Sequence, residues 1–252
     1  MRATTPDHAT TSRHPTFPGS RHANGWLRSL AILTSLVALG DVVFMTLIPE
    51  VIPPLALGVA LTLIGIGLLR VRPRAGIAVL GLTSLVLGLL AVLILSPHLA
   101  HPGSPVDFLH AVLSVAGRAL ATVAGVGAWR GASAAGARRL ATGALGLASA
   151  AIAVSAVAVL TVSSEAARPG DLPVVVAGSQ FPPTVTIEPG QTLHLDNQDV
   201  FRHTFTVPDT DLDVDLPATT AVRAAVDLPP GSYDVICDIA GHEHMTAVLV
   251  VD

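Results

Sequence analysis

Five long apolar stretches in the first two thirds of the chain constrain its fold more than any other feature. A helix needs about 20 mostly apolar residues to cross the hydrocarbon core of a membrane. Five segments reach this length: Leu27–Ile48, Val51–Leu69, Ala75–Leu95, Val106–Ala128 and Leu140–Val162. Only 13% of the 252 residues are charged, against about 25% in soluble domains. We therefore expect an all-α bundle of five transmembrane helices over residues 25–163.

The distribution of arginine predicts how this bundle is oriented. Arginines precede the first segment and fill the second and fourth connections, whereas the first and third connections contain none. Positively charged loops stay in the cytoplasm, so we expect a multi-pass protein of the cell membrane with a cytoplasmic N-terminus. The C-terminal domain would then be extracellular or periplasmic. Residues 1–24, rich in Thr, Ser, Pro and His, are predicted to be a disordered cytoplasmic tail.

Several polar side chains fall within or beside the apolar segments. Asp41 lies inside the first and Arg118 near the middle of the fourth, and ionisable groups in lipid usually face a partner or a cavity. Two interpretations remain open: a structural ion pair, or part of a proton or ion path. A second group, at the outer end of the third and fourth segments, is either a copper- or zinc-loading site or a set of ordinary polar loop residues; its members are His98, His101, Asp107 and His110.

After a polar linker at residues 164–172, the pattern changes to the period of two that is typical of strands. Turns rich in Pro and Gly, such as Pro189–Gly190, separate short segments. We expect an all-β, antiparallel Greek-key sandwich over residues 173–252. Its strands are predicted at Pro173–Gly178, Thr184–Glu188, Gln191–Asn197, Arg202–Val207, Asp211–Leu216, Ala221–Leu228, Ser232–Cys237 and Met245–Val251.

The alternation within these strands places three potential metal ligands on core faces: His203, Cys237 and Met245. By contrast, His194 is predicted to point outward. Cys237, His242 and Met245 lie within nine residues of one another at a strand end and the following turn. Two imidazoles, one thiolate and a weak thioether are the ligand set of a blue-copper electron-transfer site. The alternative interpretation is structural: Cys237 as a packed thiol, Met245 as a core residue and His242 as a loop residue.

Three segments of the last third resemble the cupredoxins, the family of plastocyanin, azurin and halocyanin. They are FPPTVTIEPGQT from Phe181, HTFTV from His203 and PPGSYDVICDIAGHEHM from Pro229. The resemblance implies one type 1 copper, with His203, Cys237 and His242 as strong ligands and Met245 as the axial ligand. It also implies that the backbone N–H of Thr204 supports the Cys237 sulfur.

This sequence departs from the family pattern at two positions. Ala240 stands where many relatives have proline, and His244 lies beside the axial position. The sequence therefore leaves two candidates for the axial ligand, Met245 and His244. The membrane half resembles no family that we recognise.

The resemblance implies a single-electron carrier that alternates between Cu(I) and Cu(II), and no catalytic residue or enzyme activity is predicted. The runner-up is copper binding, delivery or sensing, in which His98, His101 and His110 pass metal to the outer domain. The expected partners are the lipid bilayer and a basic redox protein, with no nucleic acid and no small-molecule substrate. The redox protein would dock on four alternating acids, which are otherwise a solvated strand face: Asp209, Asp211, Asp213 and Asp215.

Overall fold

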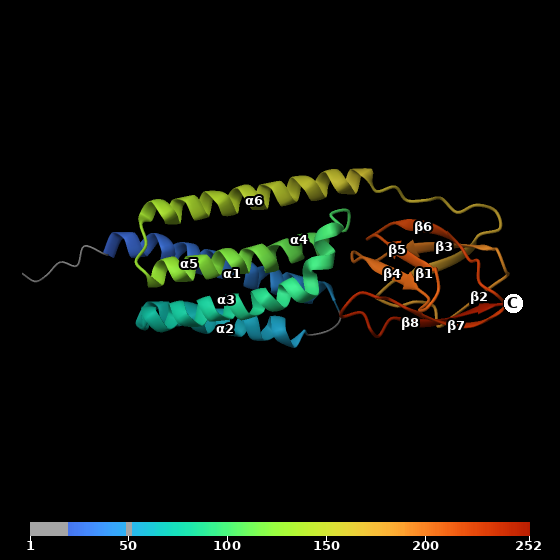
Figure 1. The fold of residues 1–252 in the computed structure, drawn as a ribbon, viewed down its shortest axis with the longest axis horizontal. Coiled ribbons are helices and arrows are strands. Elements are labelled where there is room, and N and C mark those ends of the chain that lie inside the picture. Colours follow the sequence, from blue (N-terminus) through green and yellow to red (C-terminus); the bar gives the residue numbers. More distant parts are fainter. Residues whose placement is uncertain (1–19, 49–51) are drawn as a thin grey trace, which may run out of the picture.

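The computed structural model describes residues 20–48 and 52–252, and Figure 1 shows a helical bundle at one end of an elongated molecule and a β-sandwich at the other. Residues 1–19 of the expected tail lie outside the described part. The first helix begins at Ser20, within the segment that was predicted to be a disordered tail.

The described chain contains five helical spans that are long and apolar enough to cross a membrane, which confirms the predicted bundle. The fourth span is interrupted by a π-helical turn, and prolines open α2, α3 and α4, where a helix needs no N–H donor. The elements are α1 (Ser20–Leu47), α2 (Pro53–Val71), α3 (Pro73–Leu95), the 3-10 turn η1 (Ser96–Ala100), α4 (Pro105–Val112), the π-helical turn η2 (Leu113–Gly117), α5 (Arg118–Trp129) and α6 (Ala134–Thr161).

Small residues let the helices approach one another closely. A Cβ atom on Gly125 of α5 would lie 3.3 Å from the Cα of Gly81 in α3, so the two backbones nearly touch. At the end of the bundle away from the sandwich, the indole of Trp26 donates to the carbonyls of Ala132 and Ser133. This contact ties α1 to the connection between α5 and α6. The outer faces of the bundle are apolar, as a lipid-facing surface requires.

The C-terminal domain has eight strands close to the predicted positions. They are β1 (Leu172–Val176), β2 (Thr184–Ile187), β3 (Thr192–Asn197), β4 (His203–Thr206), β5 (Asp213–Leu216), β6 (Ala221–Ala225), β7 (Gly231–Ile236) and β8 (Thr246–Val251). One sheet has the order β1-β3-β6 and the other β2-β8-β7-β4-β5. Two sheets facing each other confirm the sandwich.

The expectation of a wholly antiparallel sandwich is wrong for two strand pairs. β1 runs parallel to β3, and β2 runs parallel to β8. The chain crosses from one sheet to the other between β1 and β2 and returns for β3. Two successive reversals leave β1 and β3 pointing the same way. Pairs of this kind need no hairpin, so turn signals in the sequence do not reveal them.

The core of the sandwich follows the predicted alternation. Leu193 and Leu195 of β3 are fully buried, whereas His194 between them points outward and its Nε2 lies 2.9 Å from the carbonyl oxygen of Glu165. The rings of Phe181 and Phe205 pack edge to face with centroids 5.5 Å apart. The side chains predicted on core faces are buried among these residues, including His203, Cys237 and Met245.

The sandwich is docked on the end of the bundle by specific contacts. The backbone N–H of Arg202 donates to the Asp107 carboxylate (2.7 Å), and that of Ala218 donates to the Ser104 hydroxyl (3.1 Å). The rings of Phe44 in α1 and Phe201 meet edge to face at 5.5 Å.

The linker is also held in place. Residues 163–171 form no helix or strand, but their polar groups form hydrogen bonds with β6. For example, the Ser164 hydroxyl accepts a hydrogen bond from the backbone N–H of Ala221.

Candidate metal centre

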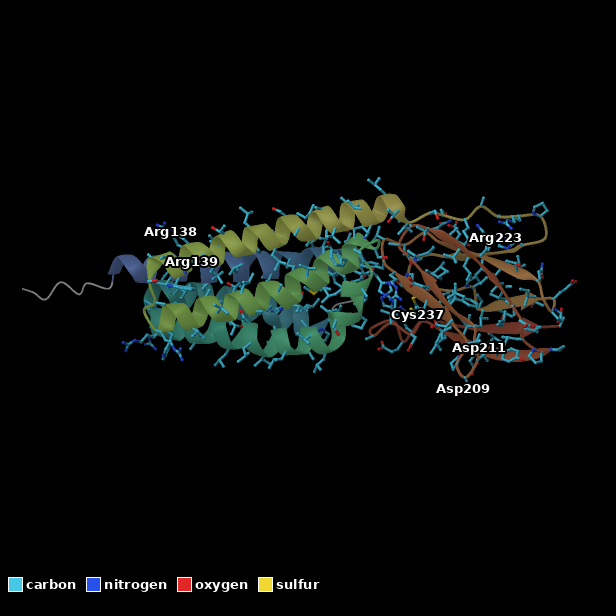
Figure 2. All side chains as sticks on the ribbon, turned by 45° about the horizontal axis from the view of Figure 1, so that its top comes forward. Arg138, Arg139, Asp209, Asp211, Arg223 and Cys237 are labelled. Atoms are coloured by element: carbon cyan, nitrogen blue, oxygen red, sulfur yellow. The ribbon has the colours of Figure 1, made fainter. Side chains whose placement is uncertain are left out.

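Three neighbouring strands bring the predicted ligands together. His203 opens β4 and Cys237 directly follows β7, and these strands are adjacent in the five-stranded sheet. His242 and Met245 lie in the turn that connects β7 to β8. Figure 2 shows Cys237 at the end of the sandwich that faces the helices.

The donor atoms of His203, Cys237 and His242 converge. The Nδ1 atoms of the two histidines are 3.2 Å apart, and the Cys237 sulfur is 3.5 Å from Nδ1 of His242. All three donor atoms lie within 4.8 Å of one another. In the part of the chain that the structure describes, no other group of His, Cys, Asp and Glu side chains has this spacing. Two imidazole nitrogens and one sulfur form the trigonal donor set that copper prefers in blue-copper sites.

Asp199 orients the first of these histidines. Its carboxylate lies 2.9 Å from Nε2 of His203 and also accepts from the backbone N–H groups of Gly178 and Ser179. The proton of His203 therefore resides on Nε2, and the lone pair of Nδ1 faces Cys237 and His242. Sequence reasoning missed Asp199. Its position four residues before His203 was visible, but the contact depends on the turn between β3 and β4.

Burial favours the neutral form of each potential ligand. A metal binds neutral imidazole, but it binds the thiolate form of a cysteine. Burial lowers the pKa of His242 to about 4 and also lowers the pKa of His203, so both imidazoles are neutral at pH 7. Burial raises the pKa of Cys237, although the N–H of Thr204, 3.4 Å from the sulfur, opposes this. The contact to Thr204 confirms the expected support of the sulfur. The thiol gives up its proton when a cation binds.

Of the two potential axial ligands, the structure buries only Met245. The backbone N–H of Cys237 donates to the carbonyl of Met245 (3.1 Å), and the Met245 side chain is 1% exposed in the same core cluster as Cys237. His244 is exposed. The four side chains His203, Cys237, His242 and Met245 thus match the donor set of a single type 1 copper site.

The ionisable side chains predicted inside the first and fourth spans pair with one another. Arg118 of α5 donates to the carboxylate of Asp41 in α1, which confirms an ion pair between the first and fourth spans. Sequence reasoning did not include His110 in this pair, yet its Nε2 lies 3.3 Å from Asp41 and 3.3 Å from the Ser114 hydroxyl. A helical period alone does not predict which groups on different helices meet.

Of the two interpretations of the polar group at the outer end of the bundle, the described residues favour ordinary polar side chains over a metal-loading site. His110 points to Asp41, Asp107 binds the backbone of Arg202, and His101 lies 3.6 Å from Asp215. His98 is buried, and its Nδ1 has no hydrogen-bond partner among the described residues. Three of the four side chains make separate contacts, and the described residues do not bring the four together around one ion.

The four predicted acids are exposed, but they do not form one uniform surface. Asp209 and Asp211 lie at one edge of the sandwich, as Figure 2 shows, and Asp213 accepts from the Thr206 hydroxyl. Asp215 instead pairs with Arg202 at the junction with the bundle. Among the described residues, Asp209, Asp211 and Asp213 form no ion pair, in contrast to Asp215.

Comparison with known proteins agrees with the fold of the C-terminal domain. Residues 150–251 match the model of the cupredoxin-like domain, a match that begins within α6 and covers the whole sandwich. The C-terminal domain is therefore cupredoxin-like. It follows five helices of membrane-spanning length, and this membrane half matches no family model among those found.

Solved structures of copper proteins are also similar to this domain. A reduced amicyanin variant has 19% identity and a TM-score of 0.30, covering 34% of this chain and 86% of its own. A copper-containing nitrite reductase from Thermus scotoductus has 27% identity and a TM-score of 0.29, covering 36% of this chain and 24% of its own. No curated protein sequence matches the chain.

Proposed function

We propose that this protein is a membrane-anchored type 1 copper protein that transfers single electrons by alternating between Cu(I) and Cu(II). His203, Cys237 and His242 would be the strong ligands and Met245 the axial ligand. The observation that carries this proposal is the convergence of two imidazole nitrogens and one sulfur within 4.8 Å at the buried end of the sandwich.

The surroundings of these residues suit electron transfer, because they hold the ligands in one arrangement. Asp199 fixes the ring of His203, and the N–H of Thr204 holds the Cys237 sulfur. Soft sulfur favours Cu(I), whereas imidazole also suits Cu(II). A site that binds both oxidation states without moving its ligands transfers an electron with little rearrangement.

The bundle supports anchoring in a membrane with the sandwich on the outer side. Arg138 and Arg139 lie at the end of the bundle away from the sandwich (Figure 2), as do the arginines between α2 and α3. The rule that positive loops remain in the cytoplasm then favours a sandwich outside the cell membrane. A reporter enzyme that is active only outside the cytoplasm, fused after Asp252, tests this orientation. An active fusion supports it, and an inactive but stable fusion contradicts it.

Spectroscopy of the full chain in detergent tests the copper site. After addition of Cu(II), we expect an intense blue thiolate-to-copper band and an EPR signal with narrow copper hyperfine splitting. Cys237→Ala and His203→Ala should lose both. His194→Ala is the matched control, because His194 lies on the outer face of the same domain, and it should keep both signals. A colourless wild type, or one with an ordinary tetragonal copper signal, would exclude single-electron transfer by a type 1 site.

We also propose that a basic redox protein docks on the exposed acids Asp209, Asp211 and Asp213. Surface charge of this kind mainly raises the association rate and makes it sensitive to salt. Replacement of the three acids by asparagine should slow reduction of a basic electron acceptor at low salt and have little effect at high salt. An unchanged rate at low salt would exclude this surface as the docking site.

A further inference from the structure

A cavity of about 480 Å³ lies where the sandwich meets the bundle, and neither the copper site nor the anchor accounts for it. Most of its wall is apolar and comes from helices of the bundle, with Phe44, Leu55, Leu87 and Leu90 among the lining residues. Its volume is within the usual range of small-molecule sites, roughly 300–1,000 Å³. Membrane helices thus supply most of a cavity that also reaches the cupredoxin-like domain.

The polar part of the cavity includes a side chain of the copper site. His242 contributes to the lining, together with His98 from the turn after α3. His98 is only 8% exposed, yet its Nδ1 has no hydrogen-bond partner within the described chain. A buried polar atom without a partner costs free energy, and a small rotation of the His98 ring toward a hydrogen-bonding ligand in the cavity that it lines would remove this cost.

The bundle contributes further polar groups to the same cavity. His110, Ser114 and Arg118 line it, and the ring of Phe44 stacks on that of His110 with centroids 4.0 Å apart. These groups surround the π-helical turn η2. Such turns are found frequently at functional sites because they shift side chains away from the regular helical positions.

We propose that this cavity binds a lipid-soluble quinone and its hydroquinone, with the ring beside His98 and His242 and the apolar tail among the helices. The wall of Phe44, Leu55, Leu87 and Leu90 suits a long apolar tail and disfavours a hydrophilic metabolite. The imidazoles and the Ser114 hydroxyl are donors and acceptors for two ring oxygens. A redox ligand is the occupant that explains why a side chain of the copper site forms part of the wall.

This inference rests on the proposed electron transfer for its purpose, because the hydroquinone would be the electron donor to copper. Oxidation of one hydroquinone to the quinone breaks two O–H bonds and releases two electrons and two protons. Each electron reduces one Cu(II) to Cu(I), so one hydroquinone serves two successive reductions, separated by transfer of the first electron to an acceptor protein. Both protons pass to the water outside the membrane.

Binding of defined quinones by the full copper-free chain in detergent tests the site without any redox reaction. The probes are a decyl-substituted benzoquinone and a naphthoquinone with a short prenyl tail, titrated calorimetrically against protein and against empty micelles. Leu90→Trp fills the cavity and should weaken quinone binding by about tenfold or more. A tenfold change in Kd corresponds to about 1.4 kcal/mol. Leu89→Trp is the matched control, because Leu89 is 61% exposed on the outer face of α3, and it should bind as wild type does.

His98 provides a second, independent variant. His98→Leu removes the proposed hydrogen bond and should weaken quinone binding by roughly tenfold, whereas His98→Gln, which still bonds a carbonyl, should restore most of it. The blue band of the copper-loaded variants should not change, because His98 is not among the proposed ligands. With copper bound, reduction of that band by the hydroquinone should slow in Leu90→Trp and not in Leu89→Trp.

The outcomes separate this inference from the proposed function. Quinone that partitions equally into protein-free micelles, or binding that Leu90→Trp and His98→Leu leave unchanged, would overturn the quinone site even if the blue copper spectrum is intact. A bound phospholipid that neither quinone displaces would overturn it as well. Conversely, specific quinone binding by a chain without a blue band would support the site and contradict copper electron transfer. Whichever of the two probes binds more tightly, the benzoquinone or the naphthoquinone, identifies the ring class of the quinone that the cavity binds.

Discussion

Nε2 of His203 lies 2.9 Å from a carboxylate oxygen of Asp199, and that carboxylate also accepts two backbone N–H groups. The carboxylate is held by the loop after β1, so it fixes the plane and tautomer of the His203 ring. A side chain outside the proposed ligand set therefore determines which nitrogen is available to a metal.

We expect Asp199→Ala to lower copper affinity by about 10–100-fold, the usual effect of removing a carboxylate that orients a ligating histidine. Titration of Cu(II) against a competing chelator measures this. Asp196→Ala is the matched control. Among the described residues the Asp196 carboxylate accepts a hydrogen bond only from the exposed Gln198, so its loss should leave the affinity unchanged. Equal affinities for wild type and Asp199→Ala would show that the loop does not orient the ligand.

The burial of Met245 and the exposure of His244 predict which of them is the axial ligand. Met245→Leu should raise the reduction potential by about 60 mV or more, a tenfold change in the one-electron equilibrium. An apolar leucine that cannot coordinate leaves the metal with fewer ligands in a less polar site, and this disfavours the more highly charged Cu(II). His244→Ala should leave the potential and the visible spectrum unchanged. Redox titration of both variants decides the assignment, and the reverse pattern would identify His244.

Asp41 and Arg118 form a buried ion pair whose side chains are 1% and 5% exposed. Removal of one partner leaves an uncompensated charge, so we expect Asp41→Ala or Arg118→Ala to cost about 3–5 kcal/mol of stability. The double variant Asp41→Leu/Arg118→Leu should recover much of this loss. Thermal unfolding in detergent measures the change, with Arg70→Gln at the exposed end of α2 as a control. Single variants as stable as wild type would indicate that the pair is hydrated.

The ion pair between Asp171 of the linker and Arg223 of β6 predicts that the stability of the sandwich depends on pH. Hydrogen bonds from Arg223 hold the pKa of Asp171 below its ordinary value of 3.8. The folded carboxylate binds protons more weakly than the unfolded one, so its stabilising contribution is complete above pH 3.8 and is lost as the pH falls below that value. Unfolding of wild type and Asp171→Asn should therefore differ most near neutral pH and converge in acid.

The exposed Asp234 provides the control for this pH dependence. Asp234→Asn should follow wild type across the whole range, because Asp234 lies on the outer face of β7. A constant difference between wild type and Asp171→Asn at every pH would contradict the expected contribution of Asp171.

The features that the sequence predicted well depend on periodicity and local spacing. Five apolar segments were sufficient to predict five spans, and alternation placed His203, Cys237 and Met245 in the core. The local motif also placed Cys237 and His242 together, because only one turn separates them. Copper ligands on adjacent elements are therefore accessible to sequence reasoning.

Features that depend on contacts between distant segments were not predicted. The parallel pairing of β1 with β3 arises from crossings between sheets, and Asp199 reaches His203 only through a loop conformation. The cavity is the clearest case, because its wall combines helices with the turn after β7. The sequence alone gives no sign of this cavity, and it therefore predicts no small-molecule substrate.

The contacts of Arg202 with Asp107, of Ala218 with Ser104 and of Phe201 with Phe44 attach the sandwich directly to the helices. A domain attached in this way does not swing on its linker to find a partner. A copper ion bound there would stay at a constant height above the lipid surface. Membrane partners would therefore be selected by how far their own redox groups stand from that surface, as well as by charge.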